Sequence, residues 1–309
     1  MTDRPADLHP AASAGGAAAA DPLAERLLDE CRRLIACGRR PLFGLNGPVG
    51  AGKSTTALDL RRRFAAAGLE LAVASIDDAY HPWPERQRRL AGNPFGVSRV
   101  PPGSHEPQAL LAPLMRWRAE AWRAPGLARA PLSLPRFDKT LRGGAGDRCD
   151  DWQGSADAVL LEGWLIGCRP LEEERLQPWC SAHALDPPRV QWLLRCNRDL
   201  EDYQELWRLL DGLVLLWPQH WRLPRRWRFQ AEARQRRRGG GWMTGAELEQ
   251  LVAATIGSLP PELYQQPLIA QALWVRELDG QRRCRWQGSG SAMLERGDQA
   301  SSDCSSATG

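Results

Sequence analysis

Two kinds of apolar pattern alternate along the first part of this chain. Between Pro22 and Gly38, apolar side chains recur at helical spacing, which predicts an amphipathic helix that packs on the core and ends at the glycine. A short apolar run over 42–45 then leads directly into a glycine-rich loop, and residues 54–67 return to a helical pattern. The pattern therefore predicts a helix and then a strand, a loop and a second helix.

Two further apolar runs predict strands that end in acidic residues. One strand, over 71–76, is followed by Asp77 and Asp78, and another, over 158–161, is followed by Glu162. In an open parallel sheet, ligands bind beyond the carboxyl ends of the strands. We therefore expect these acids to face the same crevice as the glycine-rich loop.

The remaining patterns complete an α/β fold with a central parallel β-sheet flanked by helices. A fourth strand is expected over 212–217, a last edge strand over 271–278, and a loop after Asp138. Helical patterns cover 108–123, 200–210, 219–238 and 244–258. The third of these is rich in Arg, and we expect Pro224 to break it.

Composition divides the chain into three parts. The first 20 residues are rich in Ala and lack a continuous apolar run, so 1–20 is expected to be a disordered leader and not a signal peptide. Residues 281–309 include a Gly- and Ser-rich stretch and are expected to form a disordered tail. This leaves 21–280 as one domain, long enough to bury a sizeable core.

The basic residues are almost all Arg: of 41 Lys and Arg residues, only Lys53 and Lys139 are Lys. A chain so biased retains Lys where a compact ammonium is hard to replace with a planar guanidinium, so both lysines are candidates for a functional site. Arg-rich clusters such as those over 61–63, 86–89, 222–228 and 234–238 could bind nucleic acid. However, 37 acidic residues are interleaved through the chain, so solvated helix faces and anionic small ligands explain the charge better.

The eight cysteines include no C-x-x-C pair and no spacing typical of a zinc site. Scattered cysteines in a chain of this size indicate reduced thiols and a cytoplasmic protein. No apolar run reaches 18 residues, so no membrane span is expected.

The segment from Gly47 to Ser54 fits the phosphate-binding pattern G-x-x-x-x-G-K-[ST] without a mismatch. Such a loop presents backbone N–H groups and a helix N-terminus to a phosphate chain. Lys53 is expected to reach the β and γ phosphates, and the Ser54 hydroxyl to bind Mg²⁺. The residues expected to contact a nucleotide here are Gly47, Pro48, Val49, Gly50, Ala51, Gly52, Lys53, Ser54 and Thr55.

The strand-end acids have candidate roles in phosphoryl transfer, which needs a carboxylate to accept the proton of the acceptor hydroxyl. Asp77 is placed for that role, Asp78 could take it instead, and either Asp could simply cap a turn. Glu162 is interpreted as the acid that orients Mg²⁺ or its water, the alternative being an exposed strand-end acid.

A series of short segments carries a family resemblance. In chain order the segments are Ile76-Asp77-Asp78-Ala79-Tyr80, Gly92-Asn93-Pro94, Pro102-Gly103-Ser104-His105-Glu106, Pro135-Arg136-Phe137-Asp138-Lys139, Gly146-Asp147-Arg148, Leu161-Glu162-Gly163-Trp164, Asn197-Arg198-Asp199-Leu200-Glu201-Asp202-Tyr203, Trp227-Arg228-Phe229-Gln230-Ala231-Glu232 and Met243-Thr244. They resemble the motif series of the D-glycerate 3-kinases, P-loop kinases related to phosphoribulokinase, uridine kinase and pantothenate kinase. The resemblance covers about 41–268, and the segments 135–139 and 162–164 are its most specific parts.

The resemblance implies catalytic roles for individual residues. Asp77 would face the acceptor hydroxyl and Glu162 the metal. Lys139 and Arg148 would meet the transferred phosphoryl group or the substrate carboxylate. Arg228 would belong to an Arg-rich lid that closes over ATP.

The resemblance also suggests which residues bind the acceptor. Asp78 is one candidate, His105 either touches glycerate or is a polar loop residue, and Trp164 is expected to wall the acceptor pocket. The chain departs from the family pattern at Ala79, where Phe is usual, and at Ala231, where a second Gln is common. Ala79 could loosen the acceptor pocket.

Together these features indicate an enzyme that uses ATP and Mg²⁺ to phosphorylate the 3-hydroxyl of D-glycerate, giving 3-phosphoglycerate. The alternatives are a P-loop kinase for another small alcohol, such as a nucleoside, a pantothenate-like acceptor or a sugar phosphate, and a nucleotide-dependent ATPase that binds nucleic acid through its Arg-rich segment. The sequence is silent on the oligomeric state.

Overall fold

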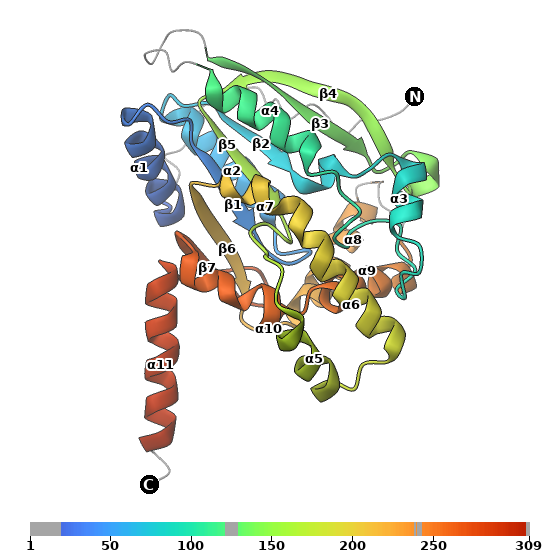
Figure 1. The fold of residues 1–309 in the computed structure, drawn as a ribbon. Coiled ribbons are helices and arrows are strands. Elements are labelled where there is room, and N and C mark those ends of the chain that lie inside the picture. The colour runs from blue at the N-terminus through green and yellow to red at the C-terminus, as the bar shows by residue number, and fades with distance from the viewer. Residues whose placement is uncertain (1–19, 121–128, 238, 240–242, 307–309) are drawn as a thin grey trace.

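The centre of the structure, a computed structural model, is a six-stranded sheet in the order β2-β5-β1-β6-β7-β8 (Figure 1). Its strands are β1 (Leu42–Asn46), β2 (Leu71–Ser75), β5 (Ala158–Gly163), β6 (Gly212–Pro218), β7 (Trp274–Leu278) and β8 (Cys284–Gly288). The first five run parallel, and β8 pairs antiparallel with β7. The structure describes residues 20–120, 129–237, 239 and 243–306, so the expected leader falls almost wholly outside the described residues.

Helices cover both faces of this sheet (Figure 1). They are α1 (Pro22–Ala36), α2 (Lys53–Ala66), α3 (Trp83–Arg89), α4 (Gln108–Ala119), α5 (Glu173–Ala182), α6 (Pro187–Asp199), α7 (Gln204–Arg208), α8 (Leu223–Arg237), α9 (Gly245–Ser258), α10 (Pro261–Tyr264) and α11 (Gly290–Ser306). Short 3-10 helices span Ile76–Ala79 (η1), Arg142–Gly144 (η2), Leu200–Tyr203 (η3) and Gln266–Gln271 (η4). The α/β fold expected from the sequence is confirmed.

Every residue of β1 and β5 is buried, which is typical of parallel strands covered on both faces. Successive side chains of a strand point to opposite faces, and the core is divided accordingly. Phe43 and Leu45 pack in one cluster with α1, α2 and Trp227 of α8, whereas Leu42 packs in a second cluster with α4, α6 and α7. The strand ends, with their polar residues, emerge between these two layers.

A second, two-stranded sheet was not expected from the sequence. Strands β3 (Ala130–Asp138) and β4 (Asp147–Ala156) form an antiparallel hairpin where only a loop after Asp138 was expected. The apolar pattern there is weak because β3 contains two prolines and β4 is mostly exposed and polar. The inner face of β3 packs on the core beside α4, which places the hairpin over the end of β2.

Several expected boundaries were wrong for local reasons. The strand expected over 71–76 ends at Ser75, and η1 carries the following acids in a tight turn. Pro224 does not break α8, because it lies in the first turn, where a helix tolerates a missing N–H. Helices α5 and α6 were missed, and the helix expected to reach 123 ends at Ala119, beyond which 121–128 lie outside the described residues.

The expectation of a disordered tail over 281–309 was wrong for most of its length. The segment up to Ser306 forms β8 and α11, so β7 is not the edge strand. The start of α11 is anchored by a hydrogen bond from Gly290 N to Ala272 O (3.1 Å), and its second turn by the ion pair of Arg296 with Glu277 (3.2 Å). Composition did not reveal this segment because contacts with β7 and η4, not an apolar pattern, hold it in place.

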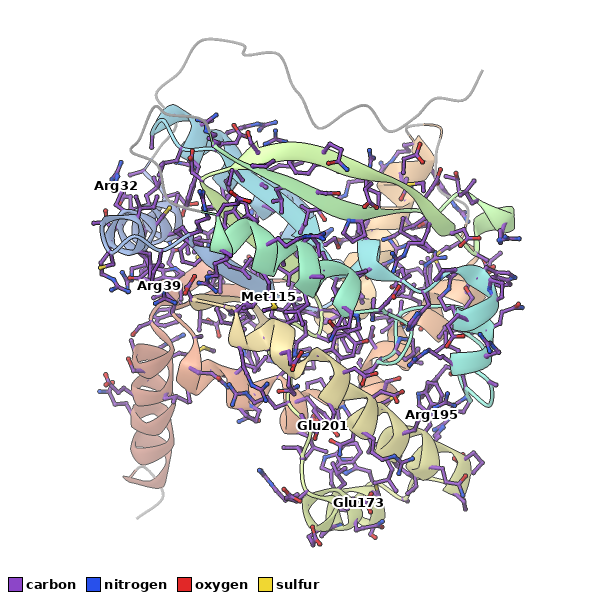
Figure 2. All side chains as sticks on the ribbon, turned by 45° about the horizontal axis from the view of Figure 1, so that its top comes forward. Arg32, Arg39, Met115, Glu173, Arg195 and Glu201 are labelled. Atoms are coloured by element: carbon purple, nitrogen blue, oxygen red, sulfur yellow. The ribbon has the colours of Figure 1, made fainter. Side chains whose placement is uncertain are left out.

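Charged side chains lie around the periphery, as the labelled Arg195, Glu173 and Glu201 illustrate (Figure 2). Many arginines of the sequence clusters pair with carboxylates, including Arg89 with Glu85 (2.9 Å) and others on exposed helix faces. In the described part of the chain, no helix is long and apolar enough to cross a membrane. The cytoplasmic location stays a prediction.

Candidate functional site

The glycine-rich loop joins β1 to α2 at the carboxyl edge of the sheet. Gly52 precedes the first turn of α2 with a φ of 93°, a left-handed conformation that favours glycine. Lys53 folds back over the loop, and its Nζ donates to the carbonyl oxygens of Gly47 (2.9 Å) and Pro48 (3.2 Å). Burial lowers the pKa of Lys53, although the charges of Glu162 and Asp77 oppose this shift. The loop and its lysine thus face the strand-end acids.

Helix α8 packs directly on this loop at Gly50. The φ of Gly50 is 78°, and a Cβ atom built there would lie 2.7 Å from the backbone nitrogen of Arg228 and 2.8 Å from the carbonyl carbon of Trp227. No side chain fits that space, so glycine is required for both its conformation and the close approach. The contact brings Arg228 to the loop, with its guanidinium 3.4 Å from the carboxylate of Glu232.

Ser54 and Glu162 meet beneath the loop. Ser54 Oγ donates to Glu162 Oε1 (3.1 Å), and the Glu162 side chain is buried at the end of β5. Hard oxygen ligands of this kind suit Mg²⁺, which is commonly held by one or two protein groups together with substrate phosphates. Among the described residues, no group of three or more His, Cys, Asp or Glu side chains forms a closed metal cage. The donor set therefore fits a Mg²⁺ ion shared with a nucleotide.

Asp77 lies at the centre of a polar network on η1. Its Oδ2 accepts a hydrogen bond from Lys139 Nζ (2.7 Å) and its Oδ1 accepts one from the Tyr80 hydroxyl (2.9 Å). Burial alone would raise the pKa of Asp77, but the adjacent Lys139 charge and the nearby His105 outweigh it and hold the pKa well below its usual range. The two sequence motifs that contain Asp77 and Lys139 are thus joined by a direct ion pair.

The surroundings of Asp78 differ from those of Asp77. Its Oδ1 accepts the backbone N–H of Phe137 (3.2 Å), which ties η1 to the β3–β4 hairpin. Burial raises the pKa of Asp78 to about 6, although the Lys139 charge and the Phe137 hydrogen bond act in the opposite direction. Asp78 therefore supports the turn that carries Asp77.

His105 is buried behind Asp77 and does not reach an open surface. Its ring stacks on Tyr80 with centroids 4.4 Å apart, its Nδ1 lies 2.9 Å from the Tyr203 hydroxyl, and its Nε2 lies 3.9 Å from Asp77 Oδ1 without a hydrogen-bond partner. Tyr203 already accepts the N–H of Gly103 (3.2 Å), so we assign its own proton to Nδ1, which places the imidazole proton on Nε2. Burial lowers the pKa of His105, although the nearby Asp77 carboxylate acts in the opposite direction.

Arg148 forms hydrogen bonds with the backbone at the end of η1. Its guanidinium donates to the carbonyl oxygens of Tyr80 and Ala79 and pairs with Glu106 (2.9 Å). The expected contact of Arg148 with a phosphoryl group or a carboxylate substrate stays a prediction. Ala79 is itself fully buried in the core, so its small side chain does not widen an open pocket.

A second arginine, missed as a functional residue by sequence reasoning, organises the same region. Arg86 belongs to a cluster that was interpreted as surface charge, yet it is fully buried. Its guanidinium donates to the carbonyl oxygens of His81 (2.7 Å), Ser98 (2.8 Å), Ala145 (2.8 Å) and Gly146 (2.7 Å). Composition alone could not separate this buried arginine from the exposed ones around it.

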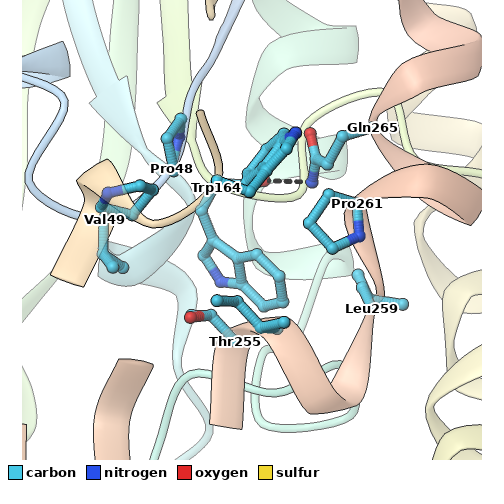
Figure 3. Close-up of a pocket in the computed structure, with 10 residues that line it drawn as sticks. Pro48, Val49, Trp164, Thr255, Leu259, Pro261 and Gln265 are labelled. Carbon is cyan, nitrogen blue, oxygen red and sulfur yellow. Dashed lines mark hydrogen bonds between the residues drawn. The ribbon is translucent and has the colours of Figure 1, made fainter. Parts of the chain in front are cut away.

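Trp164 lines a pocket next to the glycine-rich loop (Figure 3). Its indole N–H donates to Val100 O (3.2 Å), and its carbonyl oxygen accepts a hydrogen bond from Gln265 Nε2 (2.9 Å). Pro48 and Val49 of the loop and Thr255 of α9 form the facing walls. Trp164 thus lies next to the loop, although the side chains around it are mostly apolar.

Comparisons with known proteins find kinases among the relatives of this chain. No family model matches the chain. The chain is 28% identical over 221 residues to the chloroplastic D-glycerate 3-kinase of Arabidopsis thaliana, which covers 69% of this chain and 45% of that protein. It is 30% identical over 208 residues to the uncharacterized kinase mug58 of Schizosaccharomyces pombe, which covers 63% of this chain and 71% of the relative. The solved structure of the D-glycerate 3-kinase from Cryptococcus neoformans has the same fold, with a TM-score of 0.75 at 23% identity over 89% of this chain and 100% of that one.

A P-loop at the carboxyl edge of a parallel sheet, together with kinase relatives, defines an ATP-dependent P-loop kinase. The similarity to mug58 covers most of that relative, and the similarity to the Arabidopsis enzyme supports the same group. The chain belongs to the D-glycerate 3-kinase family. It spans less than half the length of the Arabidopsis relative.

Proposed function

We propose that this protein transfers the γ-phosphoryl group of ATP to the 3-hydroxyl of D-glycerate, giving 3-phosphoglycerate and ADP. The observation that carries the proposal is the ion pair of Lys139 with Asp77, beside the P-loop at the end of β2. It provides one group that can accept a hydroxyl proton and one cation for a carboxylate substrate or a phosphoryl group. The D-glycerate 3-kinase relatives support the choice of acceptor.

In the proposed reaction the acceptor oxygen attacks the γ-phosphorus, the bond from that phosphorus to the β-γ bridging oxygen breaks, and the hydroxyl proton passes to Asp77. A low pKa makes Asp77 a weak base, but the transition state of phosphoryl transfer is loose, so little basicity is needed. Lys53 would hold the β and γ phosphates. Mg²⁺, held by Ser54 and Glu162, would neutralise charge on the phosphates.

Other residues would act by positioning. We propose that Arg148 fixes η1 by holding its carbonyl oxygens, and that the Nε2 proton of His105 orients Asp77 once Lys139 turns toward the substrate. Arg228 would contact ATP from α8, and Trp164 would wall the site beside the P-loop. Thr55, exposed in the first turn of α2, would add a contact to the nucleotide.

The test is an ADP-release assay with ATP, Mg²⁺ and a panel of acceptors. D-glycerate should stimulate ADP release far above the rate with water alone, whereas uridine and pantothenate should not. Equal stimulation by a nucleoside would assign the protein to another acceptor while leaving the kinase class intact. Stimulation by duplex DNA instead, weakening with salt, would favour the nucleic-acid alternative.

A further inference from the structure

The hairpin between β7 and β8 places an arginine where such a turn favours glycine. The backbone N–H of Arg282 donates to Asp279 O (2.9 Å), and Asp279 N donates to Arg283 O (3.0 Å), which closes a three-residue loop. The last residue of such a loop adopts a left-handed conformation, normally supplied by Gly. Arg282 occupies that position with a φ of 64°, so the backbone is strained.

The strained arginine lies between the P-loop and α8. A Cβ atom built on Gly52 would lie 3.9 Å from Cδ of Arg282, so the arginine stem runs alongside the P-loop. Its Nη1 donates to Gln230 Oε1 (2.9 Å), two residues after Arg228 on α8. The indole N–H of Trp227 donates to Gly280 O (3.2 Å), which fixes the hairpin against the same helix. The hairpin therefore holds the guanidinium beside the start of α2.

The position of Arg282 differs from that of Arg228. Arg228 lies against Gly50 and interacts electrostatically with Asp77 on the acceptor side. Arg282 lies against Gly52, and the charge that acts on it most is that of Arg234 on α8. The two arginines thus lie against the P-loop at different glycines.

We propose that Arg282 binds the nucleotide, at the part of the phosphate chain that ATP and ADP share. A guanidinium has five donors in a rigid fork, and one hydrogen bond to Gln230 leaves others for phosphate oxygens. Natural proteins break local backbone rules mostly at functional sites, and replacement of Arg282 by glycine would relieve the strain but lose this contact. The inference rests on the proposed kinase function, but it concerns the nucleotide and not the acceptor.

The experiment measures the dissociation constants of ADP and of ATP with Mg²⁺ by calorimetry, without an acceptor, alongside thermal unfolding. Arg282→Gly should weaken the binding of both nucleotides equally, by about 10- to 100-fold, the effect of losing a hydrogen bond between charged groups. Its Tm should stay the same or rise, because glycine relieves the left-handed backbone. Arg283→Ala, at the exposed neighbouring position, is the control and should leave both constants unchanged.

One further variant separates nucleotide binding from bracing of α8. Gln230→Ala removes the partner on α8 but keeps Arg282, and it should weaken nucleotide binding much less than Arg282→Gly does. Equal effects of these two variants, or a fall in Tm for Arg282→Gly, would overturn the proposal in favour of a structural brace. Unchanged ADP binding in Arg282→Gly would also overturn it. Because no acceptor is present, failure of the glycerate assignment would not affect these results.

Discussion

Lys139 is half exposed, yet its ammonium is held 2.7 Å from Asp77. We predict that Lys139→Arg lowers kcat/KM for the acceptor by about 10- to 100-fold, equivalent to one hydrogen bond between charged groups. Arginine would pair with Asp77 through its planar fork and could not transfer to the substrate as a compact ammonium does. Steady-state kinetics at saturating ATP would measure the effect.

The matched control is Arg136→Lys, the reverse exchange at an exposed position in β3, the strand that directly precedes Lys139. This variant should keep normal kinetics. If Lys139→Arg behaves like Arg136→Lys, then Lys139 is outside the site, and the rarity of lysine in the chain is a matter of composition.

Lys53→Arg should abolish turnover, because a guanidinium does not fit where Nζ now contacts the carbonyl oxygens of the loop.

The two adjacent aspartates should respond differently to the same substitution. Asp77→Asn should lower kcat by about 10² to 10⁴, the usual loss for a general base, while ATP binding is retained. Asp78→Asn should cost less, because the amide oxygen of the variant can still accept the N–H of Phe137. Single-turnover rates and ATP binding would be measured for both. Reversed penalties would move the base to Asp78 without moving the site.

Stability against pH provides a second readout for Asp78. Folding raises the pKa of this carboxyl from 3.8 to about 6. The protonated carboxyl therefore contributes to the stability of the folded state fully below pH 3.8, and this contribution is lost as the pH rises through about 6. The amide that replaces the carboxyl in Asp78→Asn does not titrate. Relative to the wild type, the unfolding free energy of this variant should therefore increase between these pH values and then level off. Urea unfolding across that range would measure it, and a flat difference would contradict the assigned pKa.

At the scale of elements, the approach of α8 to the P-loop depends on one glycine. Gly50→Ala should weaken nucleotide binding and speed amide exchange in α8, because a methyl group would meet backbone atoms 2.7–2.8 Å away. Gly68→Ala is the matched control: its φ of 80° is similar, but nothing lies within 4 Å of the added carbon. Both should lose about 1–2 kcal/mol of stability through left-handed strain. If Gly68→Ala impairs nucleotide binding equally, α8 is not responsible.

The elements that the sequence predicted well are those with a strong apolar period. Helix α1 buries Leu23, Leu27 and Leu34 as their spacing indicated, and β1 is wholly buried. The β3–β4 hairpin and β8 were missed because strand-to-strand backbone pairing holds them, while β4 and β8 lack an apolar pattern and two prolines interrupt that of β3. Local sequence carries little information on such pairing.

At the scale of the molecule, motifs located the site but not the contacts within it. The contacts of Ser54 with Glu162 and of Asp77 with Lys139 join segments that are far apart in the chain. The motifs indicated that these residues belong to one site, but not which of them are in contact. The motif of Arg148 did not indicate its hydrogen bonds to carbonyl oxygens, and Arg282 carried no motif at all. Which arginine is buried, and on what, depends on tertiary packing that no local pattern encodes.

The strand order also determines when the site can form during synthesis. Strand β1 lies between β5 and β6, with Leu42 beside Val159 and Phe43 beside Gly212. Both neighbours leave the ribosome long after the P-loop does, and such distant pairings make folding slow. Until then an apolar strand and its glycine-rich loop are exposed to aggregation and proteolysis. Nascent chains that stop before β6 should therefore depend on chaperones and bind no nucleotide, even though they already contain every residue of the phosphate loop.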